Sequence, residues 1–282
     1  MANTIDQAFI TQFESEVHLI FQKQASRFKG TCRTANVQGS KARFQVIGKG
    51  AASQKSRNAD ITPMSAGSAG ENVAHSFKEA VLADWYAAEY VDKLDELKIN
   101  INERQALASS EAYALGRKCD EIVISAIETG ATDAGLLDLS TVDGATNVFR
   151  RFGENEVPDD GMRFCAVSNK GWTDLMNIPE FSNMDYIMPE QASWANGATA
   201  KRWLGINWMT DTQLSNDATN TTGLAWHSRA VGIGLGTDIS TEINYVPEKV
   251  AHLITSFISL GAVVIDGTGA FKFTYADTGP LT

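Results

Sequence analysis

The chain has 282 residues and a formal net charge of −10, with 43% hydrophobic and 21% charged residues. This composition is typical of a folded globular protein and excludes an intrinsically disordered one. No apolar run approaches the roughly 20 residues that span a bilayer, and the acidic N-terminus does not resemble a signal peptide. We therefore expect a soluble protein from a cytosol-like compartment, with one large or two smaller cores.

Motifs for catalysis, cofactors or metals are not found in the sequence. Cys32, Cys119 and Cys165 are far apart and form no CxxC pair, so we expect buried free thiols. The four histidines lack zinc-ligand or Ser–His spacing. The glycine run at 232–236 lacks the dinucleotide-binding spacing, and Gly48-Lys49-Gly50 lacks that of a phosphate loop. We expect no enzymatic activity, no cofactor and no bound metal.

Charge is distributed unevenly along the chain. Between Val17 and Ala59 there is no Asp or Glu, which leaves 15 basic against 34 acidic residues elsewhere. Nine basic residues lie in this basic block: Lys23, Arg27, Lys29, Arg33, Lys41, Arg43, Lys49, Lys55 and Arg57. A basic segment in an otherwise acidic molecule favours association with further copies of the same chain.

The basic block has the pattern of two β-strands. Charged and apolar residues alternate over 27–33 and over 41–46, and a turn signal lies at 36–40, so we expect these strands to pair as a hairpin. An isolated hairpin is marginal in water and needs another surface. Alternatively, the basic strands are solvated edges that block aggregation. Binding of single-stranded nucleic acid is less favoured, because only Phe28 and Phe44 could stack on bases.

The remaining elements indicate an α+β protein. An amphipathic helix is expected from Ile5 to Gln24, and a long helix over 102–129 that ends at Gly130. The periodicity over 75–91 fits either a strand or a helix. An acidic loop is expected at 153–161 and a polar loop at 211–223. Further strands are expected at 163–168, 205–209, 225–234, 249–265 and 270–275, and a short helix at 169–178.

Several of these segments, taken in order over about residues 25–275, resemble the tailed-bacteriophage major capsid proteins with the Hong Kong 97-type fold, which encapsulin shells share. The segments are Ala87–Asp95, Ala114–Glu121, Asn169–Leu175, Leu204–Met209, Trp226–Gly232 and Ser259–Val264.

The resemblance implies a division of the chain into four parts and makes 77–90 a strand. These parts are an N-terminal arm at 1–24, an extended β-hairpin loop at 25–75, a peripheral domain at 76–140 and 238–262 with a spine helix at about 102–129, and an apical domain at 141–237 and 263–282.

The resemblance also implies a function and partners. Such a chain self-assembles through pentamers and hexamers into an icosahedral shell that encloses phage double-stranded DNA. Its expected partners are further copies of itself, a separate scaffolding protein, a portal protein at one vertex and DNA that is contacted weakly and nonspecifically, with no membrane. Assembly is expected in the host cytoplasm and the final location is the virion capsid.

For this function we hypothesise that six basic residues dock on acidic surface of the adjacent subunit. They are Arg27, Lys29, Arg33, Lys41, Arg43 and Lys49. Two alternatives remain open at this point. One is an encapsulin-like nanocompartment shell, and the other is a monomeric β-rich binding protein that uses the loop at 211–223 for its ligand.

Overall fold

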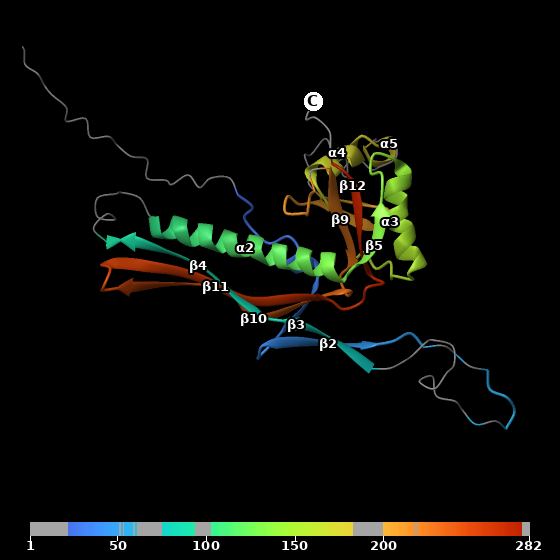
Figure 1. The fold of residues 1–282 in the computed structure, drawn as a ribbon, viewed down its shortest axis with the longest axis horizontal. Coiled ribbons are helices and arrows are strands. Elements are labelled where there is room, and N and C mark those ends of the chain that lie inside the picture. Colours follow the sequence, from blue (N-terminus) through green and yellow to red (C-terminus); the bar gives the residue numbers. More distant parts are fainter. Residues whose placement is uncertain are drawn as a thin grey trace, which may run out of the picture. The chain divides into compact units, whose positions relative to one another are not determined.

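The computed structural model describes residues 22–50, 52, 54–58, 60, 75–93, 103–182, 200–217 and 219–277 (Figure 1). The helix expected from Ile5 to Gln24 therefore lies almost entirely outside the described residues. The chain divides into two compact units, each of which is described by itself. The first unit comprises Met1–Ser26, Asp84–Lys118 and Thr237–Ile258, and the second comprises Arg27–Ala83, Cys119–Gly236 and Ser259–Thr282.

A six-stranded mixed sheet forms the centre of the second unit. Its order is β5 (Thr132–Leu136), β12 (Ala270–Ala276), β9 (Asn220–His227), β6 (Arg163–Val167), β8 (Ile206–Thr210) and β7 (Ala200–Trp203). The pairs β5–β12 and β6–β8 are parallel, whereas β12–β9, β6–β9 and β7–β8 are antiparallel. β6 is buried on both faces, and after Arg163 its residues Phe164–Val167 form a continuous apolar run.

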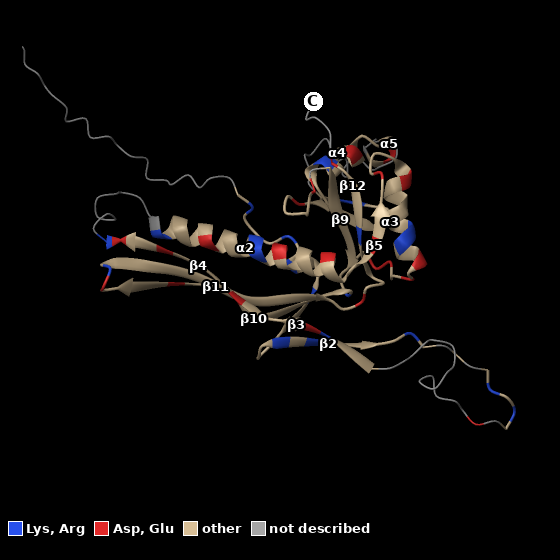
Figure 2. Cartoon of the chain, viewed as in Figure 1, with Lys and Arg blue, Asp and Glu red and all other residues tan. Residues whose placement is uncertain are grey.

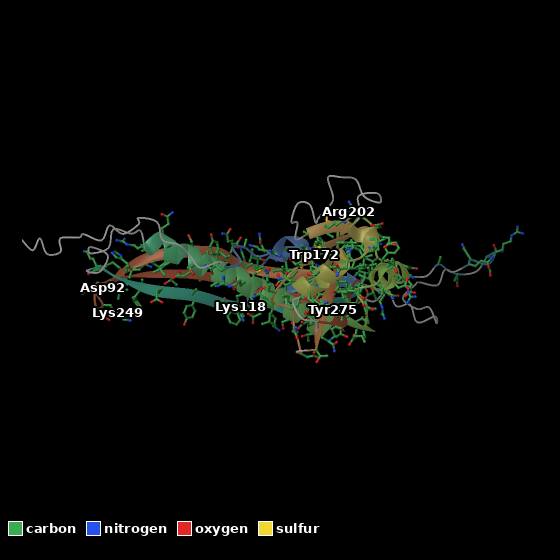
Figure 3. All side chains as sticks on the ribbon, turned by 90° about the horizontal axis from the view of Figure 1, so that it is seen from above. Asp92, Lys118, Trp172, Arg202, Lys249 and Tyr275 are labelled. Atoms are coloured by element: carbon green, nitrogen blue, oxygen red, sulfur yellow. The ribbon has the colours of Figure 1, made fainter. Side chains whose placement is uncertain are left out.

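Three helices accompany this sheet: α3 (Val142–Glu154), α4 (Asn169–Met176) and α5 (Pro179–Ser182). Hydroxyl caps begin two of them, since Thr141 Oγ1 accepts from Gly144 N at 3.3 Å and Ser168 Oγ from Gly171 N at 3.1 Å. Proline suits the first turn of a helix, and α5 begins at its proline. Trp172 and Tyr275 (Figure 3) belong to the aromatic core of this unit. The strand and the short helix expected near 163–178 are confirmed.

A four-stranded sheet has the order β1 (Arg33–Asn36), β10 (Val231–Val246), β11 (Ala251–Val264) and β4 (Ala83–Asp92). The long helix is confirmed as α2 (Glu103–Gly130), and so are the strands at 249–265 and 270–275. Within the first unit, α2, which carries Lys118 (Figure 3), lies against this sheet. Lys118 Nζ is 4.2 Å from the centre of the Trp85 ring. The ambiguous stretch 75–91 is extended, as β3 (His75–Val81) followed by β4.

The hairpin expected between 27–33 and 41–46 is wrong. β2 (Lys41–Ile47) pairs antiparallel with β3, so that Lys41 lies opposite Val81, while β1 pairs parallel with β10. The middle of the first expected strand is a 3-10 helix, Lys29–Thr31. Alternation defines the faces of a strand but not its partner. The partner is decided by burial, which brings Ala42 and Phe44 together with Ala80 in one apolar cluster.

Two further boundaries differ from expectation. The strand expected over 225–234 is two strands, because β9 ends at His227 and β10 begins at Val231. A turn separates them, in which Ala230 N donates to His227 O at 2.8 Å. The polar loop expected at 211–223 is shorter, since β9 already begins at Asn220. The turn from His227 to Ala230 contains no Gly, Pro, Asn or Asp, so the sequence carried no strong turn signal there.

Candidate assembly surface

The β2–β3 hairpin has one buried face and one exposed face. Alternate residues Ala42, Phe44 and Ala80 are buried on its inner side. The residues between them form the outer hairpin face: Lys41, Arg43, Gln45 and Ile47 from β2, and His75, Phe77, Glu79 and Val81 from β3. Large apolar side chains remain uncovered on this face, where Phe77 is 55% and Val81 63% exposed. An exposed surface that mixes large apolar and charged groups is typical of a protein–protein interface.

The charges of the outer hairpin face are ordered around one carboxylate. Glu79 accepts hydrogen bonds from Lys41 Nζ at 3.0 Å and from Arg43 Nε at 2.7 Å. These two bonds lower the pKa of Glu79 below its ordinary value. The Arg43 guanidinium also lies 4.8 Å from the centre of the Phe77 ring. Two cations around one anion leave this face with a net positive charge, as Figure 2 shows for β2.

Glycines of the second unit allow the hairpin to lie close to the underlying sheet. A Cβ atom at Gly234 would lie 2.5 Å from Ala42 Cβ, and one at Gly232 would lie 2.7 Å from the Phe44 ring. At Gly261 it would lie 2.1 Å from the carbonyl oxygen of Val81. Real Cβ atoms do not approach other atoms this closely, so the run at 232–236 serves close packing of the hairpin.

The structure brings some of the six predicted basic residues together and separates others. Lys41 and Arg43 share Glu79, as described above, and Arg33 lies 5.9 Å from the centre of the Phe44 ring. Lys49 Nζ binds Glu156 Oε2 at 2.7 Å, which lowers the pKa of that carboxyl. Lys29 begins the 3-10 helix.

Arg27 makes hydrogen bonds within the second unit. Its guanidinium donates to the carbonyl oxygen of Thr210 at 2.6 Å, and its backbone N–H donates to Asp120 at 3.0 Å. Reasoning from sequence missed three residues that contact the predicted basic residues: Glu79 beside Lys41 and Arg43, Phe77 beside Arg43, and Glu156 beside Lys49. The alternation over 75–81 contained the signal for the first two, because Phe77 and Glu79 fall on one face if the stretch is a strand.

One histidine away from this surface, His227, is held by hydrogen bonds to its neighbours. His227 is buried, its Nε2 lies 3.0 Å from Asp160 Oδ1, and its Nδ1 accepts from Arg229 N at 3.2 Å. The bond to His227 lowers the pKa of Asp160.

In the part of the chain that the structure describes, no group of three or more His, Cys, Asp and Glu side chains could hold a metal ion. No helix within the same described residues is long and apolar enough to cross a membrane.

Several solved structures, among them phage and GTA capsids, are similar in fold to this chain. The capsid structure of cyanophage P-SCSP1u is 18% identical, with a TM-score of 0.74, and covers 96% of this chain and 94% of the other. The capsid of a native GTA particle is 12% identical, with a TM-score of 0.74 over 98% and 99% of the two chains. A structure from Mycobacterium phage Che8 is 14% identical, with a TM-score of 0.69 over 95% and 97%. None of the curated protein sequences matches the chain.

These similarities define the class of the fold as the α+β Hong Kong 97-type architecture. A family model described as phage capsid protein matches residues 5–277. The chain therefore belongs to the phage capsid protein family. It is a structural protein, the major capsid protein of an icosahedral virion shell.

Proposed function

We propose that this chain assembles through pentamers and hexamers into a shell around phage double-stranded DNA, and that its role is structural rather than catalytic. The observation that carries the proposal is the outer hairpin face, on which Phe77 and Val81 remain more than half exposed. A rotation that closes these contacts into rings gives capsomers. Assembly in the host cytoplasm, a separate scaffolding protein, a portal protein at one vertex and weak, nonspecific DNA contacts belong to the same proposal.

The division of the chain into four structural parts also belongs to this proposal. The parts are an N-terminal arm at 1–24, an extended hairpin loop at 25–75, a peripheral domain at 76–140 and 238–262, and an apical domain at 141–237 and 263–282. The pairing of β2 with β3 supports an extended loop, because the chain between them, from 48 to 74, leaves and returns at one end of the hairpin.

Docking of basic residues on a neighbouring subunit is the proposed contact. Arg27, Lys29, Arg33, Lys41, Arg43 and Lys49 are its residues, and the outer hairpin face presents Lys41 and Arg43 to a partner. Each exposed ion pair contributes only about 0–1 kcal/mol. The contact therefore depends on many pairs repeated over many copies, and on burial of Phe77 and Val81.

The first test is negative-stain electron microscopy with sedimentation of the full chain, expressed alone and with candidate scaffold genes. Closed shells or capsomer rings are the expected products. A 30.5 kDa monomer under every condition would overturn the proposed assembly. Particles that retain nuclease-protected DNA in infected cells would support the phage shell, whereas particles that always enclose a protein would favour a nanocompartment.

A matched pair of variants tests the docking contact. Lys41 lies on the outer hairpin face, and Lys78 is an exposed lysine of the same hairpin on the opposite face. Lys41→Glu should lower shell yield several-fold, whereas Lys78→Glu, with the same change of charge, should lower it less. Equal yields from both variants would count against the outer face as the contact.

A further inference from the structure

A buried histidine holds the turn between β9 and β10. The turn leads from His227, the last residue of β9 in the six-stranded sheet, to Val231, the first residue of β10 in the four-stranded sheet. The His227 side chain is 4% exposed. Arg229 N donates to its Nδ1 atom at 3.2 Å, and its Nε2 atom lies 3.0 Å from Asp160 Oδ1. Because Nδ1 accepts from a backbone N–H group, the imidazole in this arrangement carries its proton on Nε2 and donates it to Asp160.

The imidazole supplies one of the acceptors that the turn needs. Two other N–H groups of the turn have backbone acceptors, since Ser228 N donates to Met162 O at 3.0 Å and Ala230 N to His227 O at 2.8 Å. The N–H group of Arg229 instead bonds to the side chain two residues before it, which is the spacing of an Asx turn. An Asx turn uses an amide or carboxylate oxygen as acceptor, whereas the acceptor here is a nitrogen that can take up a proton.

The surroundings of His227 contain charges of both signs and a route for protons. A cavity of about 150 Å³ is lined by His227 and its neighbours, so protons from solvent can reach the buried ring. The bond from His227 lowers the pKa of Asp160, so this carboxylate stays ionised when the ring gains a proton. The charged groups around the ring are Asp160 of the acidic loop, Arg163 opposite on β6, Arg229 of the turn, and Glu156 and Asp266 across the cavity.

We propose that His227 is an acid-sensitive switch that opens the turn between β9 and β10. Protonation of Nδ1 replaces the acceptor of the Arg229 N–H group by a second donor, and two N–H groups cannot bond to each other. The Nε2–H bond to the Asp160 carboxylate is kept and becomes charge-assisted, so the ring stays in place while the turn is released. Protons bind more tightly to the open turn, so the closed turn is favoured at high pH and lost as the pH falls. These contacts lie within one subunit, and the switch therefore does not depend on the proposed assembly.

The test measures hydrogen exchange of the Arg229 amide in unassembled, full-length subunits by NMR. In the wild type, the protection factor, which is corrected for the pH dependence of intrinsic exchange, should fall about tenfold between about pH 8 and about pH 5. His227→Asn keeps an acceptor for the Arg229 N–H group as an Asx turn but cannot titrate, so its protection factor should change less than about twofold. His75→Asn removes an exposed histidine of β3 and should follow the wild type.

A second readout needs no variant. The nitrogen chemical shift of His227 Nδ1 distinguishes an accepting nitrogen from a protonated one, and it should change over the same pH range in which the Arg229 amide loses protection. A wild-type protection factor that stays constant over this range would overturn the switch, and so would an equal loss of protection in His227→Asn. If His227→Asn does not fold, the wild type decides alone, because loss of protection at Arg229 while Nδ1 remains unprotonated contradicts the proposal.

Discussion

Asp120 shows how one side chain positions a distant segment. This carboxylate is fully buried in the second unit and accepts the backbone N–H groups of Arg27 and Phe28 at 3.0 and 3.1 Å. Phe28 is thereby held against Trp226, with ring centres 5.4 Å apart. A buried acid that accepts two N–H bonds replaces its lost hydration. This contact directs the chain toward β1 and explains why residues 27–31 do not form a strand.

Glu111 is a second buried acid, and it gives a prediction about pH. It lies on α2 and is 7% exposed. Burial raises its pKa and the nearby Glu89 carboxylate adds to this, while Ser256 opposes it. A carboxyl with a raised folded-state pKa contributes stability that is fully present below its ordinary pKa and is lost as pH rises through the folded-state value.

Glu111→Gln should therefore flatten the fall in the free energy of unfolding as pH rises above the ordinary pKa of a glutamate, and stabilise the protein at neutral pH. Urea unfolding of unassembled subunits between weakly acidic and neutral pH measures this slope. Glu121→Gln, at an exposed position of the same helix, is the control. An unchanged slope in Glu111→Gln would show that this carboxyl does not cause the dependence.

At the scale of elements, the β2–β3 hairpin packs closely only because the residues beneath it are glycines, which have no side chain. Gly234→Ala would place a Cβ atom 2.5 Å from Ala42 Cβ, so the hairpin must move away from β10. Overpacking of this kind costs about 1–3 kcal/mol. Gly153→Ala is the control, because no heavy atom lies within 4 Å of its added Cβ in α3, and it should be neutral or stabilise by about 0.5–1 kcal/mol. Thermal unfolding of both variants tests the difference, and equal melting temperatures would contradict the close packing.

At the scale of the whole molecule, the thiols give a prediction about the shell. Cys32, Cys119 and Cys165 are free and buried, and burial raises the pKa of Cys32 to about 12 and that of Cys165 well above its ordinary value. Buried neutral thiols react slowly, because the thiolate is the reactive form. Shells dissolved in SDS without reductant, with free thiols blocked, should therefore run as a single 30.5 kDa band. A ladder of multimers that collapses with dithiothreitol would show disulfides between subunits.

Sequence by itself determined the class of the fold, the long helix, most strands, the buried thiols and the separation of a basic block from an acidic remainder. These features depend on local periodicity and on charge counts, which need no knowledge of tertiary contacts. Charge counts also identified Lys41 and Arg43 as members of the basic block. Their shared partner Glu79 lies 38 and 36 residues further along the chain.

Only the tertiary structure decided which strands pair. The sequence could not indicate that β1 joins β10 while β2 joins β3, because the period of two defines the faces of a strand and is the same for every partner. The close glycine contacts arise from long-range packing in the same way. Arg27 illustrates the result at one residue, because nothing in the sequence indicated that its guanidinium donates to the carbonyl oxygen of Thr210.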